Sequence, residues 1–117
     1  MSEDFYCEQV LSGRISVEKV VETESVLAYH HTHPFWETHI VVIPKRHISS
    51  LLTVEDGDAK LLLELFRVIR EVAAAVVADQ GAARVLTNLG LYQESKHLHF
   101  HINSGRQIRP DQARPVS

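Results

Sequence analysis

The chain has 117 residues, 44% hydrophobic and 23% charged, a composition typical of one folded globular domain with its own core. The formal net charge of −3 excludes a broad electrostatic attraction to DNA or RNA, and a single cysteine, Cys7, excludes an internal disulfide framework. The acidic start MSEDFYCEQV does not read as a signal peptide, and no run approaches the roughly 20 apolar residues of a membrane span. We therefore expect a cytoplasmic protein with no membrane or nucleic-acid partner.

Three strands are predicted in the first part of the chain. Residues 17–23 and 26–31 contain β-branched and apolar residues and are separated by a short turn. Residues 38–44 form a third apolar and β-branched run, which Pro44 ends.

A long helix is predicted to follow. Thr53 and Asp56 resemble a capping box with Asp in place of Glu, and Gly81 marks the expected end of the helix. Between them, hydrophobic residues recur at helical spacing. Those expected on the buried face are Leu62, Leu65, Phe66, Ile69, Val72, Ala73 and Val76.

Residues 84–88 and 97–103 are predicted to form two further strands. Strands, one long helix and more strands indicate an α+β fold, with a mostly antiparallel sheet of about five strands and the helix packed on it. We expect a single domain at residues 1–108. Residues 109–117 are expected to be a short flexible tail, because Pro110 and Pro115 discourage regular structure.

Histidine and apolar residues alternate in KHLHFHIN, residues 96–103. Alternate side chains of a strand share a face, so the apolar side chains are expected to face the helix and the histidines to face outward together. Simple solvation does not favour three imidazoles, so a chemical use is the better explanation. The alternating residues are His97, Leu98, His99, Phe100, His101 and Ile102.

One such use is metal binding, because imidazole is a good zinc ligand. A strand rises about 3.3 Å per residue, which puts His97 and His101 roughly 13 Å apart, whereas zinc–nitrogen bonds are about 2.0 to 2.1 Å. One ion would therefore use one or two of the histidines with partners from elsewhere. The available partners are Asp4, Cys7, His39 and His47.

Another use is catalysis. A neutral imidazole is a nucleophile and a base near neutral pH, and its conjugate acid donates a proton. In such a row, the middle histidine, His99, would attack an electrophilic centre. A flanking histidine would orient it or serve the leaving group.

The sequence resembles the histidine triad (HIT) family. KHLHFHIN is similar to the motif His-φ-His-φ-His-φ-φ, where φ is apolar, except that Asn103 fills the last position. HIVVIPKRHI resembles the strand and Pro-Lys-x-His segment before the family's helix, and TNLGLYQESKH resembles the loop before its triad. SGRQI is similar to the segment after the triad in the histidine-triad nucleotide-binding branch. The similarity spans roughly residues 5–108.

The resemblance implies a nucleotide-binding hydrolase or transferase acting at an α-phosphate, on a nucleoside phosphoramidate, dinucleoside polyphosphate or nucleotide conjugate. It implies that His99 forms a covalent nucleotidyl-histidine intermediate, which water hydrolyses. His101 and His39 would contact the phosphate and assist charge and proton transfer, and His97 would hold His99 in the right tautomer. It also implies a homodimer.

Further residues are implied to contact the nucleotide. The resemblance gives Asn88 and Gln93 the task of positioning phosphate oxygens or water. It also places Ser95, His31 and Tyr29 at the nucleotide.

Two substrate-contact positions depart from the family pattern. His31 stands where the nucleotide-binding branch commonly has an Asp for the ribose hydroxyls, and a neutral imidazole accepts one hydrogen bond where a carboxylate has four lone-pair sites. Glu94 stands where a Ser commonly contacts phosphate, and a carboxylate there repels phosphate unless Lys96, His31 or a cation compensates. We expect the reaction type to be kept and the substrate to be altered or narrowed.

Two alternatives stay open. The family resemblance offers a structural zinc at Asp4, Cys7, His47 and His97, although Asp4 is a poorer ligand than the thiolate usual there, and we expect no required cofactor. The departures at the substrate-contact positions offer a second function. The chain would then be a catalytically weak or inactive HIT-fold module that binds a nucleotide, a metal or a protein partner.

Overall fold

The computed structural model describes residues 5–109 and contains five strands, one long helix and four short helical turns. In chain order the elements are η1 (Tyr6–Leu11), β1 (Lys19–Glu22), β2 (Val26–His30), β3 (Trp36–Pro44), η2 (Leu51–Thr53), η3 (Asp56–Asp58), α1 (Ala59–Gln80), β4 (Arg84–Leu86), η4 (Gly90–Tyr92) and β5 (Phe100–Gln107). The predicted tail begins at Arg109, and its remaining residues lie outside the described part.

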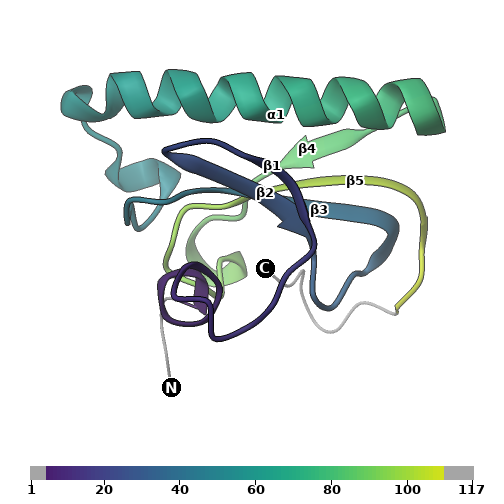
Figure 1. The fold of residues 1–117 in the computed structure, drawn as a ribbon, viewed down its shortest axis with the longest axis horizontal. Coiled ribbons are helices and arrows are strands. Elements are labelled where there is room, and N and C mark those ends of the chain that lie inside the picture. The colour runs from purple at the N-terminus through teal and green to yellow at the C-terminus, as the bar shows by residue number, and fades with distance from the viewer. Residues whose placement is uncertain (1–4, 110–117) are drawn as a thin grey trace.

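The strands form one antiparallel sheet in the order β1-β2-β3-β5-β4. Helix α1 lies along one face of this sheet, and the N-terminal turn η1 lies on the other side (Figure 1). The predicted α+β class, with one long helix on an antiparallel sheet, is confirmed. Because β5 inserts between β3 and β4, segments far apart in sequence meet at the centre of the sheet.

The start of the long helix differs from the prediction. Thr53 forms a capping box with Ser50, and Glu55 forms a second one with Asp58. Each box closes a short 3₁₀ turn, so the predicted pairing of Thr53 with Asp56 is wrong and α1 begins only after these two turns. Its end is as predicted, since Gly81 takes the left-handed conformation, φ 90°, and its N–H donates to the carbonyl of Val77.

Helix α1 and one face of the sheet enclose the larger core, which contains apolar residues from β2, β3, β5 and the helix. Most of the predicted helix face is buried there, and Val68 adds to it. Phe66, predicted as buried, is 49% exposed, because only one edge of its ring meets Phe100, at a centroid distance of 6.0 Å. Leu98, Phe100 and Ile102 lie in this core, as the alternation predicts.

The opposite face of the sheet carries a second, smaller core under η1, in which apolar and aromatic residues of β2 and β3 meet the N-terminal turn. The triad histidines belong to this face but are not solvent-exposed as predicted: His97, His99 and His101 are 0%, 1% and 2% exposed. Part of the covering comes from η1, whose Tyr6 ring lies 4.7 Å from that of His99 and 5.8 Å from that of His97. The residues of this smaller core are Tyr6, Val10, Leu27, Tyr29, Val41 and Ile43.

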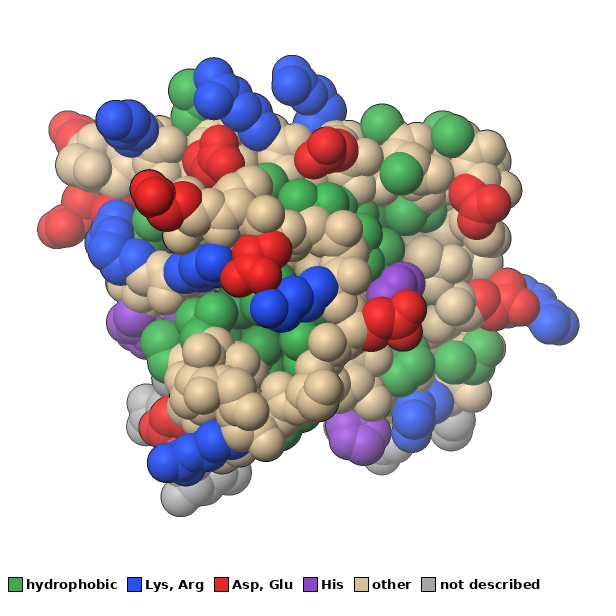
Figure 2. Space-filling model, viewed as in Figure 1, with side chains coloured by type: hydrophobic (Ala, Val, Ile, Leu, Met, Phe, Trp, Pro, Cys, Tyr) green, Lys and Arg blue, Asp and Glu red, His purple; other side chains and the backbone are tan. Residues whose placement is uncertain are grey.

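The surface in Figure 2 carries basic and acidic side chains intermixed, with hydrophobic atoms between them. None of the helices between residues 5 and 109 combines the length and apolar character that crossing a membrane requires.

Candidate active site

The antiparallel pairing of β3 with β5 brings two buried histidines together. His101 lies opposite Val41, and His39 is two residues earlier on the same face of β3. Their rings meet, with His39 Nε2 3.0 Å from His101 Nδ1. A residue of the sequence's first third is thereby joined to the triad.

The hydrogen bonds around these two rings fix their tautomers. The backbone N–H of Phe35 donates to His39 Nδ1 at 3.1 Å, so a neutral His39 carries its proton on Nε2. That Nε2–H then donates to His101 Nδ1, and His101 carries its own proton on Nε2. The result is a relay that ends in an N–H donor on His101.

Both rings are neutral near pH 7. Burial, and secondly the neighbouring His31, lower the pKa of His39 to about 3. Burial also lowers the pKa of His101 well below its usual value, with further contributions from His99, His39 and His31. These imidazoles therefore offer neutral hydrogen-bonding groups.

His99 has the opposite tautomer. Its Nδ1 lies 2.6 Å from the backbone carbonyl of His97, which has no proton to give, so Nδ1–H donates and Nε2 keeps the lone pair. The hydroxyl of Thr87 donates to the His99 carbonyl at 2.7 Å and holds this part of the chain. The ring of His101 stands edge-on at 5.1 Å. A nucleophilic nitrogen and an N–H donor are thus neighbours.

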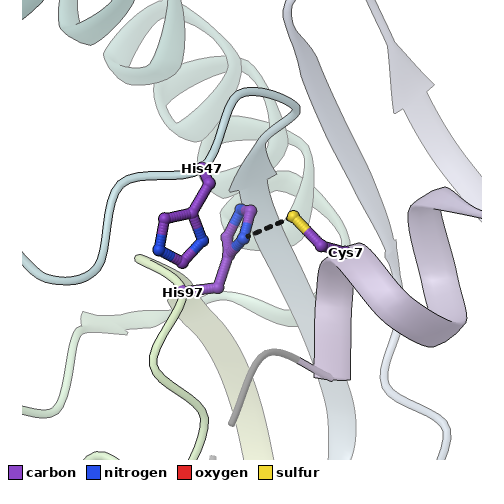
Figure 3. Close-up of side chains that lie close together, drawn as sticks. All are labelled: Cys7, His47 and His97. Atoms are coloured by element: carbon purple, nitrogen blue, oxygen red, sulfur yellow. Dashed lines mark hydrogen bonds between the residues drawn. The ribbon is translucent and has the colours of Figure 1, made fainter. Parts of the chain in front are cut away.

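The side chain of His97 faces away from this pair. Its Nε2 lies 2.8 Å from the carbonyl of Pro44, so Nε2–H donates there and Nδ1 keeps the lone pair. That Nδ1 lies 3.4 Å from the sulfur of Cys7, which comes from η1 (Figure 3). The contact that sets the tautomer of His99 therefore comes from the main chain of His97.

Cys7, His47 and His97 form a cluster with the chemistry of a zinc site. One ligand atom of each lies within 4.8 Å of the others, and the His47 ring stands edge-on to that of His97 at 5.3 Å. A thiol and two imidazoles are ligands that zinc prefers, and a carbonyl that accepts the other N–H of a ligating histidine is the usual supporting contact. The residues present fit the ion. Asp4, the fourth predicted ligand, lies outside the described residues.

A second cluster joins His31 to the buried pair. One ring nitrogen each of His31, His39 and His101 lies within 4.8 Å of the others. The His31 ring lies 4.4 Å from that of His39, with 30° between their planes. The position that departs from the family pattern is therefore in contact with the triad.

The other predicted nucleotide contacts are of two kinds. The Nδ2 of Asn88 is buried and has no hydrogen-bond partner among residues 5–109. The amide of Gln93 donates to the carbonyls of Ser49 and Ser95, at 2.7 and 3.0 Å, and the Ser95 hydroxyl accepts from the N–H of Phe5 at 3.2 Å. As placed, Gln93 and Ser95 brace the loops, and Asn88 presents a donor.

Tyr29 and Glu94 lie at opposite extremes of burial. Tyr29 is 1% exposed, and burial raises the pKa of its hydroxyl. It packs in the smaller core with Tyr6, at 6.5 Å between rings, which is a structural position for a residue predicted to meet the nucleotide. Glu94 is exposed at the rim of the loop before the triad.

Two residues near the triad escaped the sequence reasoning. Tyr6 covers His99 from η1, a six-residue turn with no periodic pattern to reveal it. Thr87 holds the His99 carbonyl, and its only signal is its place beside Asn88 in the TNLG loop.

Comparisons with known proteins identify the family. The family model described as HIT domain matches residues 12–108. A HIT-like protein of 13.2 kDa from Azospirillum brasilense is 38% identical over 108 residues, covering 87% of this chain and 86% of its own. Among solved structures, a HIT family hydrolase from Legionella pneumophila matches with a TM-score of 0.78 and 30% identity, over 91% of this chain and 96% of its own. A histidine triad protein from Clostridium difficile matches with a TM-score of 0.77 and 32% identity, over 96% and 98%. The chain belongs to the HIT domain family.

Proposed function

We propose that the protein is a nucleotide hydrolase or transferase that acts at an α-phosphate through a nucleotidyl-histidine intermediate on His99. The observation that carries the proposal is the pairing of tautomers. His99 holds its lone pair on Nε2, and its neighbour His101 carries a proton on Nε2. Membership of a family that includes a protein described as a HIT family hydrolase supports the reaction class.

In the first step, His99 Nε2 attacks the α-phosphorus, and the bond from phosphorus to the leaving nitrogen or oxygen breaks. The leaving group takes a proton from solvent water as it departs, and the water that attacks in the second step returns a proton to solvent. In the second step, water attacks the same phosphorus, the P–N bond to His99 breaks, and a nucleoside monophosphate leaves. Donors at His101 Nε2 and Asn88 Nδ2 stabilise the charged phosphate oxygens in both steps.

A neutral nucleophile suits this substrate. Burial lowers the pKa values of His39 and His101, so these rings stay in the neutral imidazole form. A neutral imidazole approaches an anionic phosphate without the repulsion that a carboxylate would meet. Placement and neutral donors would therefore supply most of the catalysis.

Turnover assays test the proposal. Wild type should release mononucleotide from adenosine or guanosine phosphoramidates or from dinucleoside polyphosphates, and His99→Ala should lose at least about 10³-fold in kcat/KM because the nucleophile is gone. His30→Ala is the matched control, since His30 is exposed at the end of β2 and should leave turnover unchanged. The absence of His99-dependent turnover on every substrate would leave the inactive binding module as the better account.

A homodimer is also part of the proposal. Strand β4 is an edge strand of the sheet, and all three of its residues are exposed, including Val85 and Leu86. An exposed apolar edge strand offers a ladder and side chains for a second copy. Light scattering after size exclusion should give twice the chain mass of 13.3 kDa, and a monomer would contradict this part.

A structural zinc at Cys7, His47 and His97 is a second proposal, and the orientation of the His97 ring supports it. When bound, the ion would tie η1 to the loop after β3 and to the residue whose carbonyl holds His99. Metal analysis of purified protein should find about one zinc per chain, lost in Cys7→Ala. A melting temperature that a chelator lowers in wild type but not in Cys7→Ala is expected with it. Zinc-free protein that melts identically with and without added zinc would contradict the proposal.

A further inference from the structure

His31 lies beside the triad without being part of it. Strand β2 ends at His30, but the N–H of His31 donates to the carbonyl of His39 at 2.8 Å and extends the ladder by one residue. Alternation then puts the His31 side chain on the face of Tyr29 and His39. Its ring is tilted by 30° against that of His39 at 4.4 Å and stacks on that of His101 at 6.0 Å, with an interplanar angle of 28°.

A backbone contact decides what the His31 ring offers. The N–H of His33 donates to His31 Nδ1 at 2.9 Å, so the lone pair of Nδ1 is in use and a neutral ring carries its proton on Nε2. The group that His31 presents is therefore an N–H donor. A ring in this state does not supply the acceptor that a pair of ribose hydroxyls needs.

The same argument weighs against a metal in this cluster. His31 and His39 both accept a backbone N–H on Nδ1, so a metal on either Nε2 would move the proton to Nδ1, against that backbone N–H. The histidine of the zinc-like cluster, His97, has the reverse arrangement, with a carbonyl accepting its N–H. The two clusters thus differ in the ring nitrogens that they could offer to an ion.

We propose that His31, which lies in one cluster with His39 and His101, is a specificity-determining residue whose Nε2–H donates to an anionic phosphate oxygen of the bound nucleotide. The inference rests on the proposed function and deepens it. The His31 side chain would then favour ligands that carry a phosphate, and it would not recognise the ribose hydroxyls. The substrate class is a nucleotide held mainly through its phosphate.

Binding of adenosine 5′-monophosphate and of adenosine, measured by titration calorimetry, tests the inference without any need for turnover. His31→Phe keeps an aromatic ring and removes the donor. It should weaken binding of the monophosphate by about tenfold or more and leave binding of adenosine unchanged. His31→Gln places an amide N–H near the position of Nε2 and should restore binding to within about threefold of wild type. His31→Asp should weaken binding of the monophosphate more than His31→Phe does, because the carboxylate repels the phosphate.

Three outcomes would overturn the inference. One is a His31→Phe variant that binds the monophosphate as wild type does, or a wild type that does not bind it. Another is tighter binding of both ligands by His31→Asp, the sign of ribose recognition. The third is zinc bound by Cys7→Ala in equilibrium dialysis and lost when His31→Phe is added, the sign of a metal site.

The inference and the proposed function fail separately. If monophosphate binding depends on His31 but no turnover depends on His99, the proposed enzyme activity is refuted and the role of His31 as a donor is supported. Turnover that depends on His99, with monophosphate binding unchanged by substitution of His31, would support the enzyme and refute the role of His31 as a donor. Melting temperatures of all three variants check that each is folded.

Discussion

At the scale of single residues, backbone groups set the tautomers of His99, His39 and His31. A carbonyl accepts the Nδ1–H of His99, which leaves the lone pair on Nε2, the nitrogen that we propose as the nucleophile. An N–H donates to Nδ1 of His39 and another to Nδ1 of His31, which makes both rings N–H donors at Nε2. Histidines that look equivalent in the sequence therefore present different groups, because a carbonyl faces one ring and an N–H faces another.

The buried neutral histidines predict a pH dependence of stability. The pKa of His39 is about 3 in the folded protein and 6.5 as the ordinary value, so between these pH values the unfolded chain binds more protons. Its contribution to stability is complete above pH 6.5 and is lost as the pH falls toward 3. The pKa of His101 is lowered in the same direction.

Urea unfolding from pH 6.5 to 5 measures this effect above the range where carboxylates titrate. The free energy of unfolding of wild type should fall by up to about 1.4 kcal/mol per pH unit for each such histidine. In His39→Gln the slope should be smaller by about one histidine's share. An identical slope in wild type and His39→Gln would contradict the buried, neutral state of His39.

At the scale of elements, β5 links the site to the rest of the sheet. It carries His101, the end of the triad, and two residues later Asn103, whose Oδ1 accepts from Arg84 of β4 at 2.8 Å. The Arg84 guanidinium also lies 4.3 Å from the ring centre of Trp36 in β3. The Asn that departs from the family motif is thus a link between three strands.

Further along β5, Gly105 has a structural task that can be measured. Its φ is +84°, and an added Cβ would lie 2.4 Å from Oε1 and 3.0 Å from Cβ of Glu37, whose carboxylate accepts the N–H of Arg106. Gly105→Ala should lower the free energy of unfolding by about 2–3 kcal/mol through strain and a displaced hydrogen bond.

Gly81→Ala is the matched control for that substitution. Gly81 has a φ of +90° but nothing within 4 Å of its added Cβ, so it carries the backbone strain without the crowding. It should cost about 1 kcal/mol in urea unfolding. Equal losses of unfolding free energy in the two variants would show that the Glu37 side chain moves aside at little cost. The close approach would then not affect stability.

At the scale of the whole molecule, the sheet separates two interiors of different character. The helix side is apolar. The other side, on which η1 lies (Figure 1), holds buried histidines beside the smaller core. Alternation in β5 predicted this division, because a period of two sends Phe100 and His101 to opposite faces. The helix and its end at Gly81 were also predictable, from apolar spacing and a residue suited to positive φ.

Other features could not be predicted, for physical reasons. The burial of the triad depends on η1, a short aperiodic turn whose Tyr6 reaches residues some ninety positions away. The tautomers depend on contacts with main-chain groups such as the N–H of Phe35, which any residue type supplies. Helix α1 begins later than predicted because Thr53 is the partner of Ser50 in a capping box. Ser and Thr are both favoured N-cap residues, so the sequence alone does not choose between them.

The most direct test of the central claim is intact-protein mass spectrometry at neutral pH. Wild type and His99→Ala would each be mixed briefly with adenosine phosphoramidate and quenched without acid, which protects a phosphorus–nitrogen bond. The account predicts a mass increase of one adenylyl group on wild type only, together with released monophosphate. Monophosphate released by wild type with no adduct at any mixing time, or an adduct that persists in His99→Ala, would contradict covalent catalysis by His99.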